Sequence, residues 1–159
     1  MALRAECASP AAQAAAETAM ATLNKAAAEV LAGFSVQACT DVTGFGLAGH
    51  AAEMATGDRC GLTLCMAQVP LLPGVQDYAA MGLIPEGTYR NREGRLKFLR
   101  GDLSPANLDL LFDPQTSGGL LAALPAAEAE AAQAALHAAG VPAWLIGETG
   151  GEAGLVSIR

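Results

Sequence analysis

The period of the hydrophobic positions changes several times along the 159-residue chain, and each change predicts a new element. Residues 10–33 repeat apolar side chains at helical spacing. Ser9 is placed to cap this helix, Pro10 fits its first position, and Gly33 is placed to end it. Residues 36–42 then alternate apolar and polar side chains, which predicts a half-buried strand.

A glycine turn follows this strand directly. Gly44 and Gly46 interrupt the alternation, and apolar side chains return to helical spacing from Leu47 to Gly57. The pattern therefore predicts a strand, a glycine turn and a helix in direct succession.

Shorter elements are expected in the rest of the chain. Residues 61–69 alternate well enough for a strand, and a short helix is expected near residues 75–81. Residues 82–104 show no clear period and are expected to be irregular. The later segments predict a short helix, a buried strand, an alanine-rich helix and two tail strands, at residues 104–112, 119–124, 125–139, 143–147 and 155–158.

This order of strands and helices predicts an α/β (α+β) fold, with a mixed β-sheet layered with helices. The two tail strands are expected to form a hairpin, which favours a mixed sheet over a wholly parallel one. Hydrophobic residues make up 52% of the chain, enough for a real core. We expect a single domain over residues 1–159.

Charge and hydropathy exclude some classes of function. The formal net charge of −7 argues against nonspecific binding of nucleic acid, because phosphate neutralisation needs a basic surface. No segment approaches the roughly 20 uninterrupted apolar residues of a membrane-spanning helix. We therefore expect a cytoplasmic protein that binds neither nucleic acid nor membrane. Residues 82–104 depart from the acidic average, since they hold five of the nine basic residues.

The possible metal ligands of the soft type are scattered. Cysteines lack paired C-x-x-C spacing, which favours reduced, structural thiols over zinc or disulfides; they are Cys7, Cys39, Cys60 and Cys65. His50 and His137 are too far apart in the sequence to suggest a metal site, and a local hydrogen bond is the expected role of each.

The segment from Thr40 to His50 carries the most informative chemistry. Asp41 is expected at the end of a strand, just ahead of the free N–H groups of a helix N-terminus. Mg²⁺ prefers carboxylate oxygens, and such N–H groups favour phosphate oxygens. The alternative is that Asp41 caps the following turn and that the glycines only permit tight backbone geometry.

Two further segments have both a binding and a structural interpretation. The hydroxyls and amides of Phe112–Leu121 could approach a ligand, or the Asp113 to Gly119 stretch could be an ordinary turn with close chain packing. In Gly87–Asn91, Arg90 could reach an anion or be a solvated charge. No G-x-x-x-x-G-K-[ST] or G-x-S-x-G motif is present, so the residues suggest no catalytic nucleophile.

Together these segments, T-D-V-T-G-F-G-L-x-G-H, G-T-Y-R-N and F-D-P-Q-T-S-G-G-L-L, resemble the C-terminal domain of selenophosphate synthetase. The resemblance runs from about residue 11 to residue 158. It implies the fold of the C-terminal domain of aminoimidazole ribonucleotide synthetase. It also implies that the chain is the C-terminal half of a two-domain enzyme, with the N-terminal catalytic and ATP-binding domain absent from it.

The resemblance further implies that selenide, ATP and water yield selenophosphate, AMP and phosphate, with Mg²⁺ bound to the nucleotide. Asp41 matches the family's metal ligand, and Thr43, Gly44 and Gly46 are expected to bind the nucleotide cofactor. The family's essential cysteine or selenocysteine and its lysine belong to the absent domain, and Cys39 matches neither. The chain alone is expected to have no catalytic residue and no activity, whereas the full-length enzyme is expected to be a homodimer.

Two other functions remain open at this point. The chain could be a non-catalytic binding or interaction module of the same fold that docks on a separate protein. It could also belong to another ATP-dependent synthetase of the superfamily, although residues 42–46 differ from the residues of those relatives.

Overall fold

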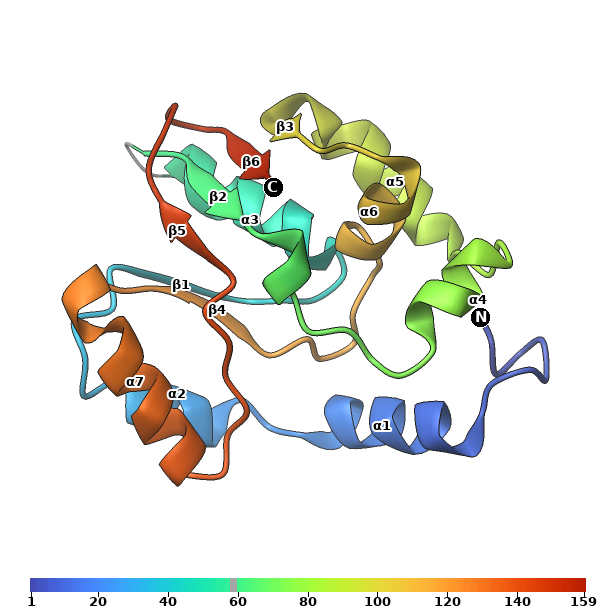
Figure 1. Cartoon of the computed structure of the whole chain (residues 1–159), viewed down its shortest axis with the longest axis horizontal. Coiled ribbons are helices and arrows are strands. Elements are labelled where there is room, and N and C mark those ends of the chain that lie inside the picture. The colour runs from blue at the N-terminus through green and yellow to red at the C-terminus, as the bar shows by residue number, and fades with distance from the viewer. Residues whose placement is uncertain (58–59) are drawn as a thin grey trace.

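The computed structural model describes residues 1–57 and 60–159. Figure 1 shows the β3-β6-β2-β5 sheet and α3 in the upper half of the molecule, α1, α2 and α7 in the lower half, and the β1–β4 ladder between them. The helices are α1 (Pro10–Ala21), α2 (Lys25–Leu31), α3 (Gly46–Gly57), α4 (Val75–Ala80), α5 (Glu86–Arg95), α6 (Pro105–Leu111) and α7 (Ala126–Ala138), with 3-10 turns η1 (Met66–Gln68) and η2 (Leu96–Phe98). The strands are β1 (Ala38–Asp41), β2 (Leu62–Leu64), β3 (Leu99–Gly101), β4 (Leu120–Ala123), β5 (Gly147–Thr149) and β6 (Val156–Ile158).

The larger sheet is mixed, as the sequence predicts. Strand β2 pairs antiparallel with β5 and parallel with β6, and β6 pairs parallel with β3. The expected tail hairpin is wrong, because β2 lies between the two tail strands. Residues 150–155 carry the chain past β2, and this central position gives the backbone of β2 hydrogen-bonding partners on both edges.

A stripe of small side chains lets α3 pack closely against the sheet. Four alanines at i, i+3, i+4 and i+7 are at most 2% exposed; they are Ala48, Ala51, Ala52 and Ala55. They join a core built from α6, β2, β3 and β6, in which Phe112 and Val156 are fully buried. Burying a side chain of the size of Phe112 contributes about 2–3 kcal/mol.

The long helix expected over residues 10–33 is wrong, since it is divided into α1 and α2. Its start is confirmed, because the Ser9 hydroxyl accepts a hydrogen bond of 3.1 Å from the Ala12 N–H. Thr22 leaves the helix in an extended conformation, and Leu23 is 79% exposed, so the expected apolar stripe has no surface to cover at this point. The second helix ends at Leu31, two residues before Gly33.

The strands expected over 36–42 and 61–69 are shorter in the structure, as β1 and β2, and the strand expected over 143–147 is wrong, because β5 shares only Gly147 with it. In place of 61–69, β2 ends at Leu64 and the 3-10 turn η1 follows. In place of 143–147, β5 begins only at Gly147. At Ala143 the backbone groups that a strand would use are hydrogen-bonded to side chains of α7. The Ala143 carbonyl oxygen accepts a hydrogen bond of 2.9 Å from Gln133, and its N–H donates one of 3.3 Å to His137.

The expectation that residues 82–104 are irregular is also wrong, because they form α5, η2 and β3. An apolar helical period is missing because α5 turns polar side chains toward the protein. Thr88 and Asn91, three positions apart, are 0% and 8% exposed. This helix therefore packs through a polar face that hydrophobic patterning does not detect.

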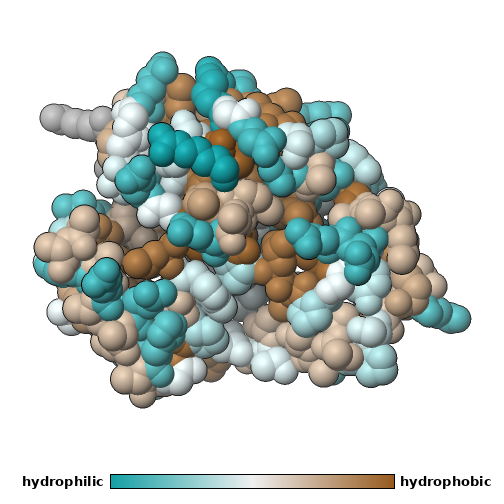
Figure 2. Space-filling view, in the orientation of Figure 1, coloured by the Kyte–Doolittle hydropathy of each residue, from teal (hydrophilic) through white to brown (hydrophobic). Residues whose placement is uncertain are grey.

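The remaining expectations are confirmed, with small shifts at their ends: α4, α6, β4 and α7 lie where the sequence predicts. The N–H and hydroxyl of Ser35 donate hydrogen bonds of 2.8 and 2.7 Å to the Glu128 carboxylate, which ties α7 to the segment before β1. Among the described residues, no helix combines the length and apolar character needed to cross a membrane. Figure 2 shows the most hydrophobic groups near the middle of one face, with hydrophilic groups between them and at parts of its edge.

Candidate functional site

Backbone hydrogen bonds bring the first and third motif segments together. The Val42 N–H donates to the Gly119 carbonyl at 2.9 Å, and the Gly118 N–H donates to the Val42 carbonyl at 2.8 Å. The Gln115 N–H reaches the carbonyl of Thr43 at 3.0 Å. These bonds continue the β1–β4 ladder beyond Asp41, so the turn after β1 and the turn before β4 form one unit.

Gly46 is the point at which these two turns touch most closely. Its φ of +71° is a conformation that favours glycine, and a Cβ atom here would lie 2.7 Å from the Leu111 carbonyl oxygen and 2.7 Å from the Phe112 carbonyl carbon. A side chain at this position would push the start of α3 away from the end of α6. Gly46 in the first motif therefore allows the backbones of the two turns to pack closely.

The second motif segment contacts both of the others from α5. The amide nitrogen of Asn91 donates hydrogen bonds of 2.7 Å to the Gly44 carbonyl and 3.1 Å to the Phe112 carbonyl. At the start of the same helix, a Cβ atom on Gly87 would lie 2.8 Å from the ring of Pro114. The three segments singled out in the sequence thus form one contiguous assembly.

Asp41 is the last residue of β1 and is exposed. Within residues 1–57 and 60–159 its carboxylate has no hydrogen bond or ion pair, so both oxygens are available as ligands. In the same part of the chain, no three His, Cys, Asp or Glu side chains are grouped closely enough to hold a metal ion. A carboxylate fits Mg²⁺ chemically, but within the described residues Asp41 does not belong to a complete metal site.

The three residues expected to bind the nucleotide differ in how much free space surrounds them and in whether their polar groups are already hydrogen-bonded. Gly44 is exposed, and a Cβ atom there would meet nothing within 4 Å. The Thr43 hydroxyl lies 3.2 Å from Nε2 of His50, whereas Gly46 is buried against α6. Nucleotide binding by these residues stays a prediction, and open space exists mainly at Gly44.

A series of polar contacts connects the turn after β1 to α3 and α5. His50 is 6% exposed and its Nδ1 lies 3.0 Å from the Glu53 carboxylate. Glu53 in turn contacts Arg95 at 3.0 Å, and the Arg95 guanidinium lies 3.6 Å from the centre of the Phe45 ring. Sequence reasoning missed Glu53 and Arg95; the i, i+3 spacing from His50 was a weak signal for Glu53, and Arg95 had none.

The cysteine beside Asp41 is poorly suited to be a nucleophile. Burial raises the pKa of the Cys39 thiol, and the negative charge of Asp41 raises it further. A thiol reacts as its thiolate, so both effects lower its reactivity near neutral pH. This agrees with the absence of Cys39 from the family's catalytic positions.

Asp113, in the third segment, is held by its neighbour. Burial raises the pKa of this carboxyl, while a hydrogen bond of 2.7 Å from the Gln115 amide and the charge of the chain's amino group act in the opposite direction. The Asp113 to Gly119 turn is thus held by the contact between Asp113 and Gln115 and by backbone hydrogen bonds to Val42 and Thr43.

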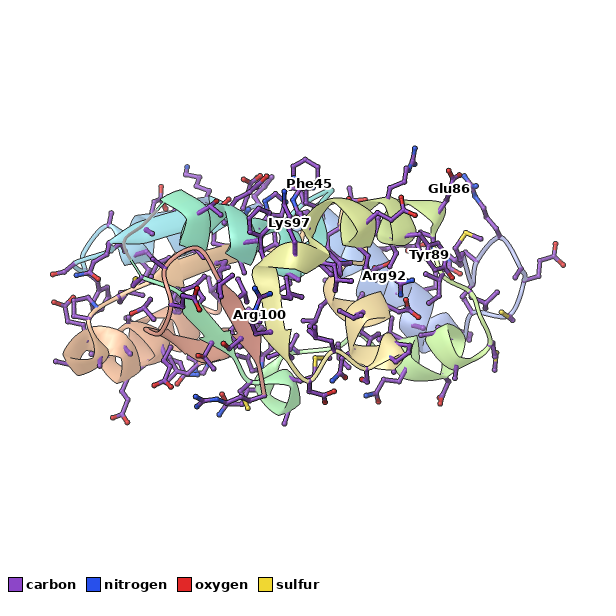
Figure 3. All side chains as sticks on the ribbon, turned by 90° about the horizontal axis from the view of Figure 1, so that it is seen from above. Phe45, Glu86, Tyr89, Arg92, Lys97 and Arg100 are labelled. Carbon is purple, nitrogen blue, oxygen red and sulfur yellow. The ribbon has the colours of Figure 1, made fainter. Side chains whose placement is uncertain are left out.

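The basic segment is largely paired with acids. Arg90 is exposed and lies 4.0 Å from Glu86, which favours the solvated-charge interpretation. Arg92 lies 3.5 Å from Asp109 on α6. Figure 3 shows Glu86, Tyr89 and Arg92 on α5, Lys97 and Arg100 on the segment that follows it, and Phe45 projecting outward.

The surface is hollowed beside α3 at some distance in sequence from Asp41. A depression of about 290 Å³ lies between α3 and α5, lined by Ala52, Glu53, Thr56, Gly94, Arg95 and Phe98. Asp41 does not line it.

The comparisons with known proteins define the class. The family described as AIR synthase related protein, C-terminal domain, matches residues 2–158, and the chain belongs to this family. The crystal structure of E. coli HypE, a hydrogenase maturation protein, has the same fold with a TM-score of 0.62 at 22% identity, over 88% of this chain and 36% of that one.

Within this class the sequence is similar to selenide, water dikinases. The protein of that name from Pelobacter propionicus is 49% identical over 81% of this chain, and the one from Trichlorobacter lovleyi is 52% identical over 66% of it. These matches confirm the resemblance drawn from the three motifs. The chain spans 38% and 31% of the lengths of these two relatives.

Proposed function

We propose that this chain is the C-terminal part of a selenide, water dikinase, an ATP-dependent phosphotransferase. The full-length protein would convert selenide, ATP and water to selenophosphate, AMP and phosphate. The relatives support this reaction because they are named selenide, water dikinases. They are also much longer than this chain, and the additional length is sufficient for the N-terminal domain that the motifs imply. We also propose that the full-length protein is a cytoplasmic homodimer.

One observation connects the proposal to particular residues: the three family motifs form one assembly that includes Asp41, whose exposed carboxylate has no ion pair within residues 1–57 and 60–159. An exposed carboxylate three residues before the open backbone at Gly44 is compatible with a Mg²⁺ nucleotide, because Mg²⁺ is usually bound by one or two carboxylates together with substrate phosphates. The other ligands would come from the N-terminal domain.

The chain's own contribution would be positional and electrostatic. Asp41 would hold Mg²⁺ together with carboxylates of the N-terminal domain, and the turn at Thr43–Gly44 would lie against the phosphates. Bound Mg²⁺ supplies neutralisation of phosphate charge, so that a nucleophile can approach phosphorus. No group of this chain takes part in bond formation, and the chain alone would not turn over ATP.

The test uses the full-length protein that contains this chain. Selenide and ATP are supplied, selenophosphate is detected by ³¹P NMR, and AMP is measured in parallel. We expect Asp41→Asn to lower the rate at limiting Mg²⁺ on the order of 10²-fold, because a metal contact is worth several kcal/mol.

Asp77→Asn is the matched control, since Asp77 is an exposed carboxylate on α4, outside the three motif segments. It should behave like the wild type. A full-length protein that makes no selenophosphate, or an Asp41→Asn variant with unchanged rate and Mg²⁺ dependence, contradicts the proposal.

A further inference from the structure

We infer that Asn91 is a positioning residue for the metal and nucleotide site, because its buried side-chain amide fixes the turn between Asp41 and α3. The inference concerns the same site as the proposed function and rests on it. Asn91 itself is only 8% exposed and would not touch the substrate.

The chemistry of the two acceptors explains why an amide stands here. Gly44 belongs to the turn and Phe112 follows the last residue of α6, so neither carbonyl accepts within a regular helix or strand. The Asn91 amide has two N–H donors, and it reaches both oxygens at 2.7 and 3.1 Å. An aspartate of the same shape would present oxygen to oxygen, and an aliphatic side chain would leave the buried Phe112 carbonyl unpaired and the Gly44 carbonyl without its side-chain donor.

The position of these bonds links them to the site. Gly44 lies three residues after Asp41 and two before the start of α3, and it is the exposed, open point of the turn. Thr43 is already held by Gln115 and His50, so the Asn91 bond is what fixes the next carbonyl group. Without it, the peptide after Gly44 is free to rotate, and the backbone facing the phosphates loses its orientation relative to Asp41.

Thr88 provides the matched control. It lies one turn earlier on the same face of α5 and is 0% exposed, yet its hydroxyl has no hydrogen-bond partner within the described part of the chain, the turn included. Thr88→Ala should therefore destabilise α5 through lost packing while it leaves both Asn91 bonds in place. A purely structural role for Asn91 would make the two variants behave alike.

The first measurement is amide hydrogen exchange by mass spectrometry in the 159-residue chain, and it does not depend on activity. In Asn91→Ala, peptides covering residues 41–47 should exchange at least about tenfold faster than in Thr88→Ala, compared at equal distance below each Tm. Equal protection in the two variants overturns the inference. If Asn91→Ala does not fold, Asn91→Ser, which retains one donor, is compared in its place.

The second measurement is made in the full-length protein. The Mg²⁺ concentration for half-maximal AMP release should rise at least about fivefold in Asn91→Ala and stay unchanged in Thr88→Ala, because a displacement of about 1 Å costs up to 10²-fold. An unchanged Mg²⁺ requirement, or the same rise in both variants, overturns the inference. If the wild type forms no AMP from ATP and selenide, the proposed function fails, and the exchange experiment still decides whether Asn91 fixes the turn.

Discussion

Cys39 and Asp41 lie two residues apart on β1, and both are exposed on the same side of the strand. Although Cys39 is exposed, partial burial of its thiol raises the pKa, and the charge of Asp41 raises this pKa further. The reactivity of the thiol therefore reports the charge state of the carboxylate beside it, and Asp41 can be probed in this way without an activity assay.

Asp41→Asn should increase the reactivity of Cys39. Removing the negative charge lowers the pKa of the thiol toward the level set by burial alone, so more thiolate is present at pH 8. Alkylation of Cys39 by iodoacetamide, followed by peptide mass spectrometry, should accelerate roughly two- to fivefold, the effect of one charge in an exposed setting. Asp77→Asn should leave the rate unchanged. Equal rates in all three proteins would show that Asp41 does not act on the thiol.

Gly46→Ala should destabilise the chain more than Gly82→Ala. Both glycines have positive φ values, +71° and +77°, so both substitutions carry strain of about 1–2 kcal/mol. A Cβ atom on Gly82 meets nothing within 4 Å, whereas one on Gly46 would meet the Leu111 carbonyl at 2.7 Å. Overpacking should add about 1–3 kcal/mol at Gly46, measurable by urea unfolding. Equal losses would contradict the close contact between the two turns.

Asp113→Asn should stabilise the chain at pH 7. Burial raises the pKa of this carboxyl, so the folded state binds its proton more tightly than the unfolded state does. The ionised carboxylate is therefore unfavourable in the folded state at neutral pH. The asparagine variant avoids that cost and keeps an acceptor for Gln115.

The stability difference between Asp113→Asn and the wild type should depend on pH in a defined direction. The wild type regains stability as pH falls through the raised pKa toward the ordinary value of 3.8, so the advantage of Asp113→Asn should shrink over that window. Partial exposure limits the gain at pH 7 to a fraction of 1 kcal/mol, or a rise in Tm of about 1–3 °C. Scanning calorimetry at pH 7 and pH 4 provides the measurement. A Tm difference that grows on acidification would refute this assignment.

Hydrophobic periodicity predicted the elements whose burial is apolar. The alanine-rich helices α3 and α7 and the strand β4 have such patterns, and Ser9 and Ser104 mark helix starts by side-chain capping. The same method failed for α5, because its buried face is made of Thr88 and Asn91. It also joined α1 and α2, since spacing alone does not reveal that Leu23 has nothing to pack against.

The candidate site was predicted as three separate segments and not as an assembly. Each segment attracted attention through local chemistry, an aspartate beside glycines in the first and a polar turn before a strand in the third. Their contact depends on Asn91 and Gly46, which reach residues of a different motif segment. Such contacts cannot be predicted from the pattern within one segment, because the hydrogen-bond acceptors of Asn91 are distant from it in the sequence.

The sequence by itself determined the family, the mixed α/β character and the position of Asp41 at the end of a strand, because motif identity and short-range periodicity are properties of adjacent residues. Only the tertiary structure decided that β2 separates the tail strands, that a polar helix packs inward, and that Asn91 joins Gly44 to Phe112. The physical reason is that buried backbone N–H and C=O groups need hydrogen-bond partners, and here these partners lie far away in the sequence. Which groups meet therefore depends on the tertiary fold as a whole.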